Sequence, residues 1–322
     1  MSSRPRVAAV VLTSVLVLAG CSANTSEPGG GGQDSAAGTE INVGVGTGVF
    51  TAPLTTDAFA EEGLKVTRKA VNSGAAAVPL LLNGQLQFSV SDATGALTAI
   101  SKGIPLVIVA TATVSGQTAL DDPTAVLVKK NATIRSASDL EGKKVAVNGL
   151  GNISQLSAAA AIDRLGGDSS KVDFVEMPPH TMTGAVTNGA VDAAVTSEPG
   201  VVLAHSAGLR TLFSPMSEAL PGVPIFVYVT SKAYLAKHRD VVDKFARANV
   251  AANKYTILRP DFVRSYAKKS SNLSDAQASD MVLPEFAVDG TDKLALQRIL
   301  DTMVKYKTIN SPIDMDEAVL TP

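Results

Sequence analysis

The chain has 322 residues, a formal net charge of −2 and 45% hydrophobic residues, with only 4% aromatic residues and no tryptophan. This length accommodates two domains of ordinary size, and the apolar content supports a packed core built largely from alanine and valine. A single cysteine excludes an internal disulfide, three scattered histidines argue against a His/Cys metal centre, and no charge block indicates nucleic-acid binding.

The N-terminus has the features of an export signal. Two arginines precede an apolar run over 7–18, and the string Leu-Ala-Gly-Cys ends at Cys21. The apolar run is too short to span a bilayer, which needs roughly 20 apolar residues. This segment resembles the lipobox of bacterial lipoproteins, which implies a signal peptide over 1–20 and lipidation of Cys21. The alternative is an ordinary signal peptide in which the cysteine stands by chance.

Residues 21–39 are rich in glycine and small polar side chains, so we expect a flexible tether there and folded structure from about Glu40. A first set of β-rich and amphipathic runs predicts strands over 41–45, 64–69, 88–90 and 106–112 and helices over 55–62, 75–82 and 94–102. A second set predicts strands over 125–129, 144–147, 172–176 and 193–196 and helices over 154–165, 182–188 and 200–207. A β run over 226–230 and helices over 240–258, 274–283 and 291–306 complete the pattern.

The repetition of strand and helix predicts an α/β fold with a mostly parallel sheet. Because there are two such sets, we expect a two-lobed clamp in which one lobe holds 40–124 plus 226–322 and the other holds 125–225. The β runs near 125–129 and 226–230 are the expected crossings between the lobes, with the cleft beside them. Helix 240–258 places Val241, Phe245, Ala248, Ala252 and Tyr255 on one apolar stripe.

Five strings in order resemble the solute-binding lipoproteins of ABC importers, specifically the nitrate/sulfonate/taurine and thiamine-precursor (NMT1/THI5-like) group. They occupy 59–66, 82–88, 139–147, 189–193 and 198–199, with Gln87 in place of the acid usual in the second string. The resemblance implies a type II periplasmic-binding-protein fold and no catalysis. It also implies a small-molecule solute, a membrane permease with its ATPase as partners, and a monomer without a cofactor.

The loop over 148–154 is the sharpest candidate site, with Gly149, Gly151, Asn152, Ile153 and Ser154 as expected ligand contacts. Glycines allow close approach of the backbone, and the amino end of the following helix favours a negative group such as a sulfonate, carboxylate or phosphate. An ordinary strand-to-helix turn is the alternative. The loop also imitates a dinucleotide fingerprint, but it lacks the third glycine.

Further candidates follow other predicted strands at their carboxyl ends, where open α/β sheets bind ligands. Thr47, Gly48 and Phe50 follow strand 41–45, and Ser91 and Asp92 follow strand 88–90. Ser91-Asp92 equally suits the amino-terminal cap of the next helix. Glu198 follows strand 193–196 and is expected either to hold a ligand ammonium or ring nitrogen or to cap the next helix.

These features predict an exported solute-binding protein, lipid-anchored at the outer face of the cell membrane or periplasmic, that captures a small anionic solute by hinge closure. A sulfonate, taurine or a nitrate-like anion is expected. A pyrimidine-type thiamine precursor or another heterocycle is the alternative ligand. An enzyme on the same fold, or a lipoprotein that senses or scaffolds, are alternatives of another class, although no Gly-x-Ser-x-Gly elbow, His-Glu-x-x-His or Walker loop is present.

Overall fold

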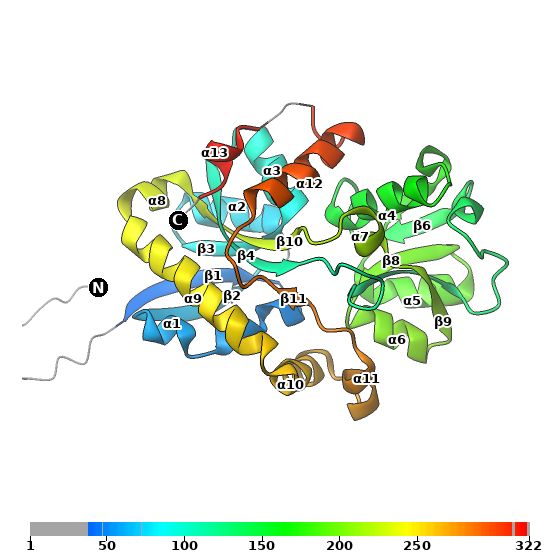
Figure 1. Ribbon diagram of the computed structural model, residues 1–322, viewed down its shortest axis with the longest axis horizontal. Coiled ribbons are helices and arrows are strands. Elements are labelled where there is room, and N and C mark those ends of the chain that lie inside the picture. Colours follow the sequence, from blue (N-terminus) through cyan, green and yellow to red (C-terminus); the bar gives the residue numbers. More distant parts are fainter. Residues whose placement is uncertain (1–37, 47, 72, 311–312, 321–322) are drawn as a thin grey trace, which may run out of the picture. The chain divides into compact units, whose positions relative to one another are not determined.

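Two mixed β-sheets organise the protein in the computed structural model, which describes residues 38–46, 48–71, 73–310 and 313–320 (Figure 1). The expected signal peptide, the lipidation site Cys21, most of the expected tether and Thr47 lie outside the described residues. Residues 37–322 belong to one compact unit. We call the six-stranded sheet with its helices the first lobe, and the five-stranded sheet with its helices the second lobe.

The first lobe contains β1 (Thr39–Val45), β2 (Leu64–Ala70), β3 (Phe88–Asp92), β4 (Leu106–Val114), β10 (Pro224–Ser231) and β11 (Glu285–Phe286), in the order β11-β4-β10-β3-β1-β2. β1 pairs in parallel with β2 and β3, whereas β10 pairs antiparallel with both β3 and β4. Its helices are η1 (Val49–Thr55), α1 (Ala58–Glu61), α2 (Gly74–Leu82), α3 (Ala93–Ser101), α8 (Lys232–Lys237), α9 (Arg239–Ile257), α10 (Pro260–Ser271), α11 (Asp275–Asp280), α12 (Lys293–Lys305) and α13 (Met315–Ala318).

The second lobe contains β5 (Thr124–Lys129), β6 (Lys144–Val147), β7 (Asp173–Glu176), β8 (Ala193–Ser197) and β9 (Leu209–Phe213), in the order β7-β6-β8-β5-β9. β6 pairs in parallel with β7 and β8, and β5 pairs antiparallel with β8 and β9. Its helices are η2 (Ser138–Leu140), α4 (Ile153–Arg164), η3 (Ser169–Lys171), α5 (Pro179–Asn188) and α6 (Gly200–Ser206). A short helix, α7 (Pro215–Ala219), lies on the connection from β9 back to β10.

The expectation of a mostly parallel sheet is wrong, because the strands that follow each exchange between lobes enter their sheets in the antiparallel sense. β5 and β10 each pair antiparallel with two neighbours. The connections between the sheets are the segments 115–123 and 214–223, while 125–129 and 226–230 pair inside the sheets. The division of the chain into lobes at 124/125 and 225/226 stays a prediction.

The expected helix over 55–62 is also wrong in its bounds. The chain instead forms η1 and then the short helix α1. The hydroxyls of Thr55 and Thr56 donate to the carbonyls of Ala52 and Pro53 at 2.7 and 2.8 Å, respectively. Such hydrogen bonds from side chains to the nearby backbone compete with the helical hydrogen bonds, so η1 ends at Thr55 and α1 begins separately at Ala58.

Apolar clusters cover the two faces of the first sheet. On one face α9 buries Val241, Phe245, Ala248 and Ala252 as the stripe predicts, and the Phe245 ring stacks on Phe88 with centroids 3.9 Å apart. Tyr255, expected on the same stripe, is 41% exposed and lies at the end of α9. On the other face α3 and α12 pack with α4 of the second lobe in one apolar cluster, so burial joins the two lobes.

Candidate functional site

The loop after β1 places an aromatic wall at the carboxyl end of the first sheet. Phe50 is half-buried, and its ring stacks on Phe226 of β10 with centroids 4.0 Å apart and an interplanar angle of 21°. A Cβ at Gly48 would lie 2.2 Å from a ring carbon of Phe50. A side chain at 48 would therefore require the Phe50 ring to move, and the ring forms one apolar edge of this loop.

Ser91 and Asp92 end β3, next to this loop. The Asp92 carboxylate accepts hydrogen bonds from the backbone N–H of Gly95 at 2.9 Å and from the Thr94 hydroxyl at 2.5 Å. Ser91 is 6% exposed and donates to the carbonyl of Asp92 at 3.0 Å. The capping role of Asp92 is therefore present in the structure, while a ligand contact of either residue stays a prediction.

The loop after β6 closes largely on itself. The Asn152 side-chain oxygen accepts from the backbone N–H of Ser154 and of Gln155, both at 3.1 Å, and so caps α4. The N–H of Gly151 donates to the Gln155 side chain at 2.6 Å, and the N–H of Leu150 donates to the Glu176 carboxylate at 3.4 Å. Several donors expected to meet an anion thus bind oxygens of the protein itself.

The glycines of this loop serve the backbone in different ways. Gly151 has φ of +76°, and a Cβ added there would meet nothing within 4 Å. The residue is therefore needed for its left-handed conformation, while the expected close approach of a ligand stays a prediction. A Cβ at Gly149 would lie 3.0 Å from the Asn152 side chain. Ile153 is 6% exposed and belongs to the apolar cluster shared with the first lobe.

Glu198, after β8, binds backbone groups of both lobes. Its carboxylate accepts from the N–H of Val202 in α6 at 3.1 Å and from the N–H of Val282, after α11, at 3.2 Å. Burial raises the pKa of Glu198 to about 7, although these hydrogen bonds and the nearby charge of Arg264 oppose the shift. The expected capping role is present, and the link to Val282 is a second role that the sequence pattern did not indicate.

Apolar and polar contacts surround this link between the lobes. Val202 of α6 packs in a cluster with residues of η1, α10, α11 and β11, all in the first lobe. The Gln277 side chain donates to the Ser206 hydroxyl at 3.1 Å. The guanidinium of Arg264 donates to the carbonyls of Ser279 and Met281 at 2.7 and 3.0 Å. Arg264 thereby fixes the end of α11, whose next residues meet Glu198.

A different set of contacts joins the lobes at the other end of α4. The Tyr306 hydroxyl, just after α12, donates to the Asp163 carboxylate at 2.6 Å. Burial raises the pKa of Asp163, but hydrogen bonds from Tyr306 and Ser169 outweigh it and hold the pKa below its ordinary value.

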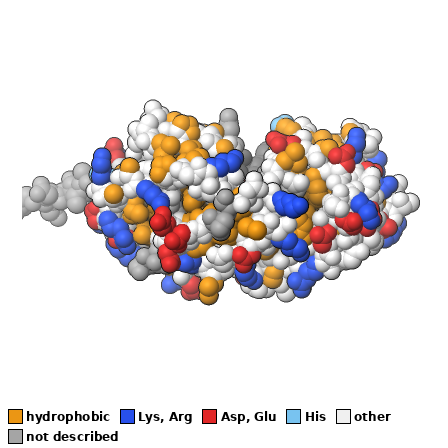
Figure 2. Space-filling view, turned by 90° about the horizontal axis from the view of Figure 1, so that it is seen from above, with side chains coloured by type: hydrophobic (Ala, Val, Ile, Leu, Met, Phe, Trp, Pro, Cys, Tyr) orange, Lys and Arg blue, Asp and Glu red, His pale blue; other side chains and the backbone are white. Residues whose placement is uncertain are grey.

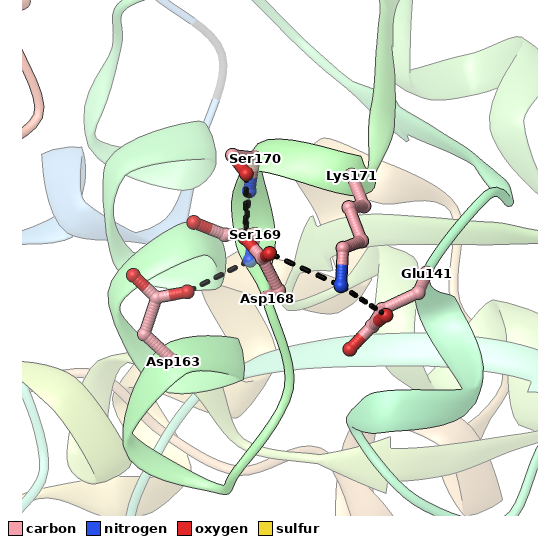
Figure 3. Close-up of polar contacts among 6 residues, drawn as sticks. All are labelled: Glu141, Asp163, Asp168, Ser169, Ser170 and Lys171. Atoms are coloured by element: carbon pink, nitrogen blue, oxygen red, sulfur yellow. Dashed lines mark hydrogen bonds and ion pairs between the residues drawn. The ribbon is translucent and has the colours of Figure 1, made fainter.

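Figure 3 shows Asp163 facing the turn after α4, where Lys171 lies between Glu141 and Asp168 at 3.0 and 3.2 Å.

Sequence reasoning missed a basic residue in the first lobe. Arg68 of β2 lines a groove of about 590 Å³ together with Val45, Gly46, Val66 and Val71. The signal was present, because Arg68 follows Leu64 and Val66 on the same face of the strand, where apolar residues are otherwise expected.

No group of three or more His, Cys, Asp or Glu side chains in the described ranges is arranged to hold a metal ion. Among the helices that the structure describes, none is both long and apolar enough to cross a membrane. Figure 2 shows Lys and Arg side chains interspersed with Asp and Glu side chains on the face drawn.

Residues 47–262 match the family model described as NMT1/THI5 like. The chain belongs to this family. The match includes all strands of the second lobe and the loops after β3, β6 and β8. The resemblance inferred from five short strings is thereby confirmed.

Two relatives whose names state a ligand match this chain at 28% and 24% identity. The chain is 28% identical to the taurine-binding periplasmic protein of Escherichia coli (strain K12) over 215 residues, 66% of this chain and 63% of that protein. It therefore matches less than two thirds of the length of that relative. It is 24% identical over 260 residues to the formylaminopyrimidine-binding protein of Halalkalibacterium halodurans (strain ATCC BAA-125 / DSM 18197 / FERM 7344 / JCM 9153 / C-125), covering 78% of this chain and 74% of that protein.

Solved structures confirm the fold. The periplasmic aliphatic sulphonate binding protein of Escherichia coli superimposes with a TM-score of 0.72 at 17% identity, covering 88% of this chain and 92% of that chain. The alkanesulfonate-binding protein of Xanthomonas axonopodis pv. citri bound to MOPS gives a TM-score of 0.71 at 16% identity, covering 88% and 98%. The two-lobed periplasmic-binding-protein architecture predicted from the sequence is therefore confirmed.

Proposed function

We propose that the protein is the solute-binding component of an ABC importer and captures a small anionic organic solute, of the sulfonate or taurine type, between its lobes. The observation that carries this proposal is the family match over 47–262. The relatives named for taurine and for sulfonates support the ligand class. A permease and its ATPase are the proposed partners, and no bond-making step is part of the proposed activity.

The proposed site lies at the carboxyl ends of strands from both sheets, where α/β proteins bind ligands. In the first lobe it comprises the loop with Thr47, Gly48 and Phe50, followed by Ser91 and Asp92. In the second lobe it comprises Gly149, Gly151, Asn152, Ile153 and Ser154, followed by Glu198. A ligand that touches both sets stabilises the closed arrangement over the open one, so that binding shifts the equilibrium that the permease reads.

We further propose that the protein acts outside the cytoplasm, anchored through a lipid on Cys21 or free in a periplasm. The lipobox-like string at 18–21 supports the anchor. Mass spectrometry of the mature N-terminus should find a diacylglycerol adduct on Cys21. A mature chain that begins elsewhere, or an equally membrane-bound Cys21→Ala variant, would contradict the anchor and leave the binding function intact.

The ligand class is tested by isothermal titration of the purified chain with taurine, ethanesulfonate, nitrate and a formylaminopyrimidine. We expect saturable binding of a sulfonate and no turnover of it, checked by mass spectrometry of the recovered ligand. Binding of none of the anions would overturn the sulfonate proposal, and recovery of a changed ligand would favour an enzyme on this fold.

A heterocyclic ligand is the second candidate, and one observation favours it. The stacked rings of Phe50 and Phe226 offer an aromatic face next to the loop after β1, and aromatic faces bind planar rings well. The relative named for formylaminopyrimidine gives independent support. Under this alternative Phe50→Leu should weaken pyrimidine binding strongly, whereas taurine has no ring to stack and should lose little.

A further inference from the structure

Arg68 is an exposed basic residue near the carboxyl end of β2, on the strand face that is otherwise apolar. Leu64 and Val66 precede it on the same strand face and pack in the apolar cluster beneath α9. Arg68 is exposed and pairs in register with Val43 of the neighbouring strand β1. Its side chain lines the groove that reaches Val45 and Gly46, the residues leading into the loop with Gly48 and Phe50. A cation therefore lies beside the proposed first-lobe site.

A chain of hydrogen bonds orients the guanidinium. Its NH1 group donates to the Tyr266 hydroxyl of α10 at 3.0 Å. The Tyr266 and Thr51 hydroxyls are 2.8 Å apart, and Thr51 donates to the carbonyl of Gly48 at 2.8 Å. Tyr266 therefore accepts from Arg68, and its hydroxyl hydrogen-bonds with that of Thr51, with either oxygen able to donate. These contacts connect the guanidinium to the backbone of the loop after β1.

Among the residues that the structure describes, most N–H groups of the Arg68 guanidinium have no hydrogen-bond partner. An arginine carries five N–H donors, and the bond to Tyr266 is the one that the described residues form with this side chain. None of the ion pairs formed within the described ranges involves Arg68. Thr51, at the far end of these hydrogen bonds, is 2% exposed, so they end in the protein interior, while Arg68 itself is exposed and lines the groove.

We propose that Arg68 is the specificity-determining residue for a negatively charged solute and binds an oxyanion, sulfonate in the first instance, in the groove at the ends of β1 and β2. This inference rests on the proposed function and adds to it the residue that selects for charge. Two N–H groups of one guanidinium match two oxygens of an oxyanion. The loop after β6 is less suited, since the Glu176 carboxylate already accepts from its backbone.

The residues around Arg68 provide matched variants. Arg68→Gln removes the charge, and Arg68→Lys keeps the charge without the planar fork. Tyr266→Phe removes only the hydroxyl that orients the guanidinium. Lys69→Gln is the control, because Lys69 is exposed, carries the same charge and lies one residue further on the opposite face of β2.

The first measurement is isothermal titration with taurine and ethanesulfonate at low and moderate salt. We expect Arg68→Gln to lose affinity about tenfold or more, the usual consequence of removing a hydrogen-bonded charge. Arg68→Lys and Tyr266→Phe should lose less, and Lys69→Gln should bind as the unchanged protein does. If the unchanged protein binds a sulfonate and Arg68→Gln binds it equally well, the role of Arg68 is overturned while the proposed function stands.

A second measurement does not depend on the identity of the solute. The arginine Nε–H resonances are recorded by NMR while inorganic sulfate is added, and Arg68→Gln identifies the resonance of Arg68. We expect a saturable shift of that resonance, retained in Lys69→Gln. If no sulfonate binds in the titration but this shift appears, the groove takes an oxyanion although the proposed solute class is wrong. Absence of the shift together with absence of sulfonate binding overturns both.

Discussion

The loops after β1 and β6 look alike in sequence and differ in what their polar groups do. Both contain glycines and both follow a strand that pairs in parallel with two neighbours. After β6, Gln155, Asn152 and Glu176 accept from the backbone N–H groups of the loop and of the first turn of α4. After β1, the loop presents the Phe50 ring. Its Gly48 carbonyl is linked through the hydroxyls of Thr51 and Tyr266 to the Arg68 guanidinium.

This difference shows that glycine content does not by itself indicate an anion site. Donors at the amino end of a helix attract an anion only where they remain free. Side-chain oxygens close to the loop in sequence, such as those of Asn152 and Gln155, compete for the same donors. A cation supported from distant segments, such as Arg68, provides charge that no local oxygen neutralises among the described residues.

The largest expected effect concerns Glu198, another oxygen acceptor of the second lobe that is already bonded to backbone N–H groups. Its folded-state pKa of about 7 lies above the ordinary value of 4.5, so the folded protein binds more protons than the unfolded chain between these values. Stability should therefore fall as the pH rises from about 4.5 to about 7, by on the order of 2–3 kcal/mol. Urea unfolding at pH 5 and pH 8 measures this change.

Glu198→Gln is the variant that isolates the effect. The amide does not titrate, so the fall in stability between pH 5 and pH 8 should shrink by the contribution of Glu198. The link to Val282 also predicts that the variant loosens α6 from the end of α11, seen as faster amide exchange at Val282. An unchanged pH profile would mean that the Glu198 carboxylate is solvated and free to bind a ligand.

Gly48→Val tests the close packing of the loop after β1. The new Cβ would overlap the Phe50 ring, which must leave its stack on Phe226. Overpacking of this kind costs typically 1–3 kcal/mol, and the aromatic wall is displaced at the same time. We expect lower stability in urea unfolding together with weaker ligand binding. Retention of full affinity would remove the loop after β1 from the site.

Gly151→Ala tests the loop after β6 by a different mechanism. No atom would oppose the methyl group, so the cost comes from the φ of +76° alone, about 1–2 kcal/mol for a non-glycine residue. Urea unfolding measures that cost, and titration of the folded variant with taurine measures affinity separately. A tenfold loss of affinity would place the anion at this loop, whereas unchanged affinity would show that Gly151 serves only the turn.

The sequence predicted those strands and helices whose burial follows from the pattern of residues close together in the chain. Alternation and a helical stripe located β1, β2 and α9, because burial on one face follows from spacing, and a continuous apolar run located β4, which is buried on both faces. The site depended on contacts between distant segments: Glu198 meets Val282 across 84 positions, and Arg68 meets Tyr266 across 198. No local pattern encodes which segments meet in space, so the second role of Glu198 and the orientation of Arg68 required the structure.

The smallest expected effect concerns the contact that holds α4, the helix after the second loop, to the first lobe. Tyr306→Phe removes the hydrogen bond to Asp163 and should cost about 0.5–1.5 kcal/mol, the usual net value of one such bond. Because the pKa of Asp163 is lowered in the folded protein, its stabilising contribution is complete above the ordinary pKa and is lost as the pH falls through the folded value. The difference in the free energy of unfolding between Tyr306→Phe and the unchanged protein should therefore be larger at pH 7 than at pH 3 in urea unfolding.

Thr302→Ala is the control, since its hydroxyl bonds only to the preceding turn of α12 among the described residues. Equal stability of Tyr306→Phe and the unchanged protein at pH 7 would show that apolar packing alone, through Ile153 and Leu156, holds α4 in place.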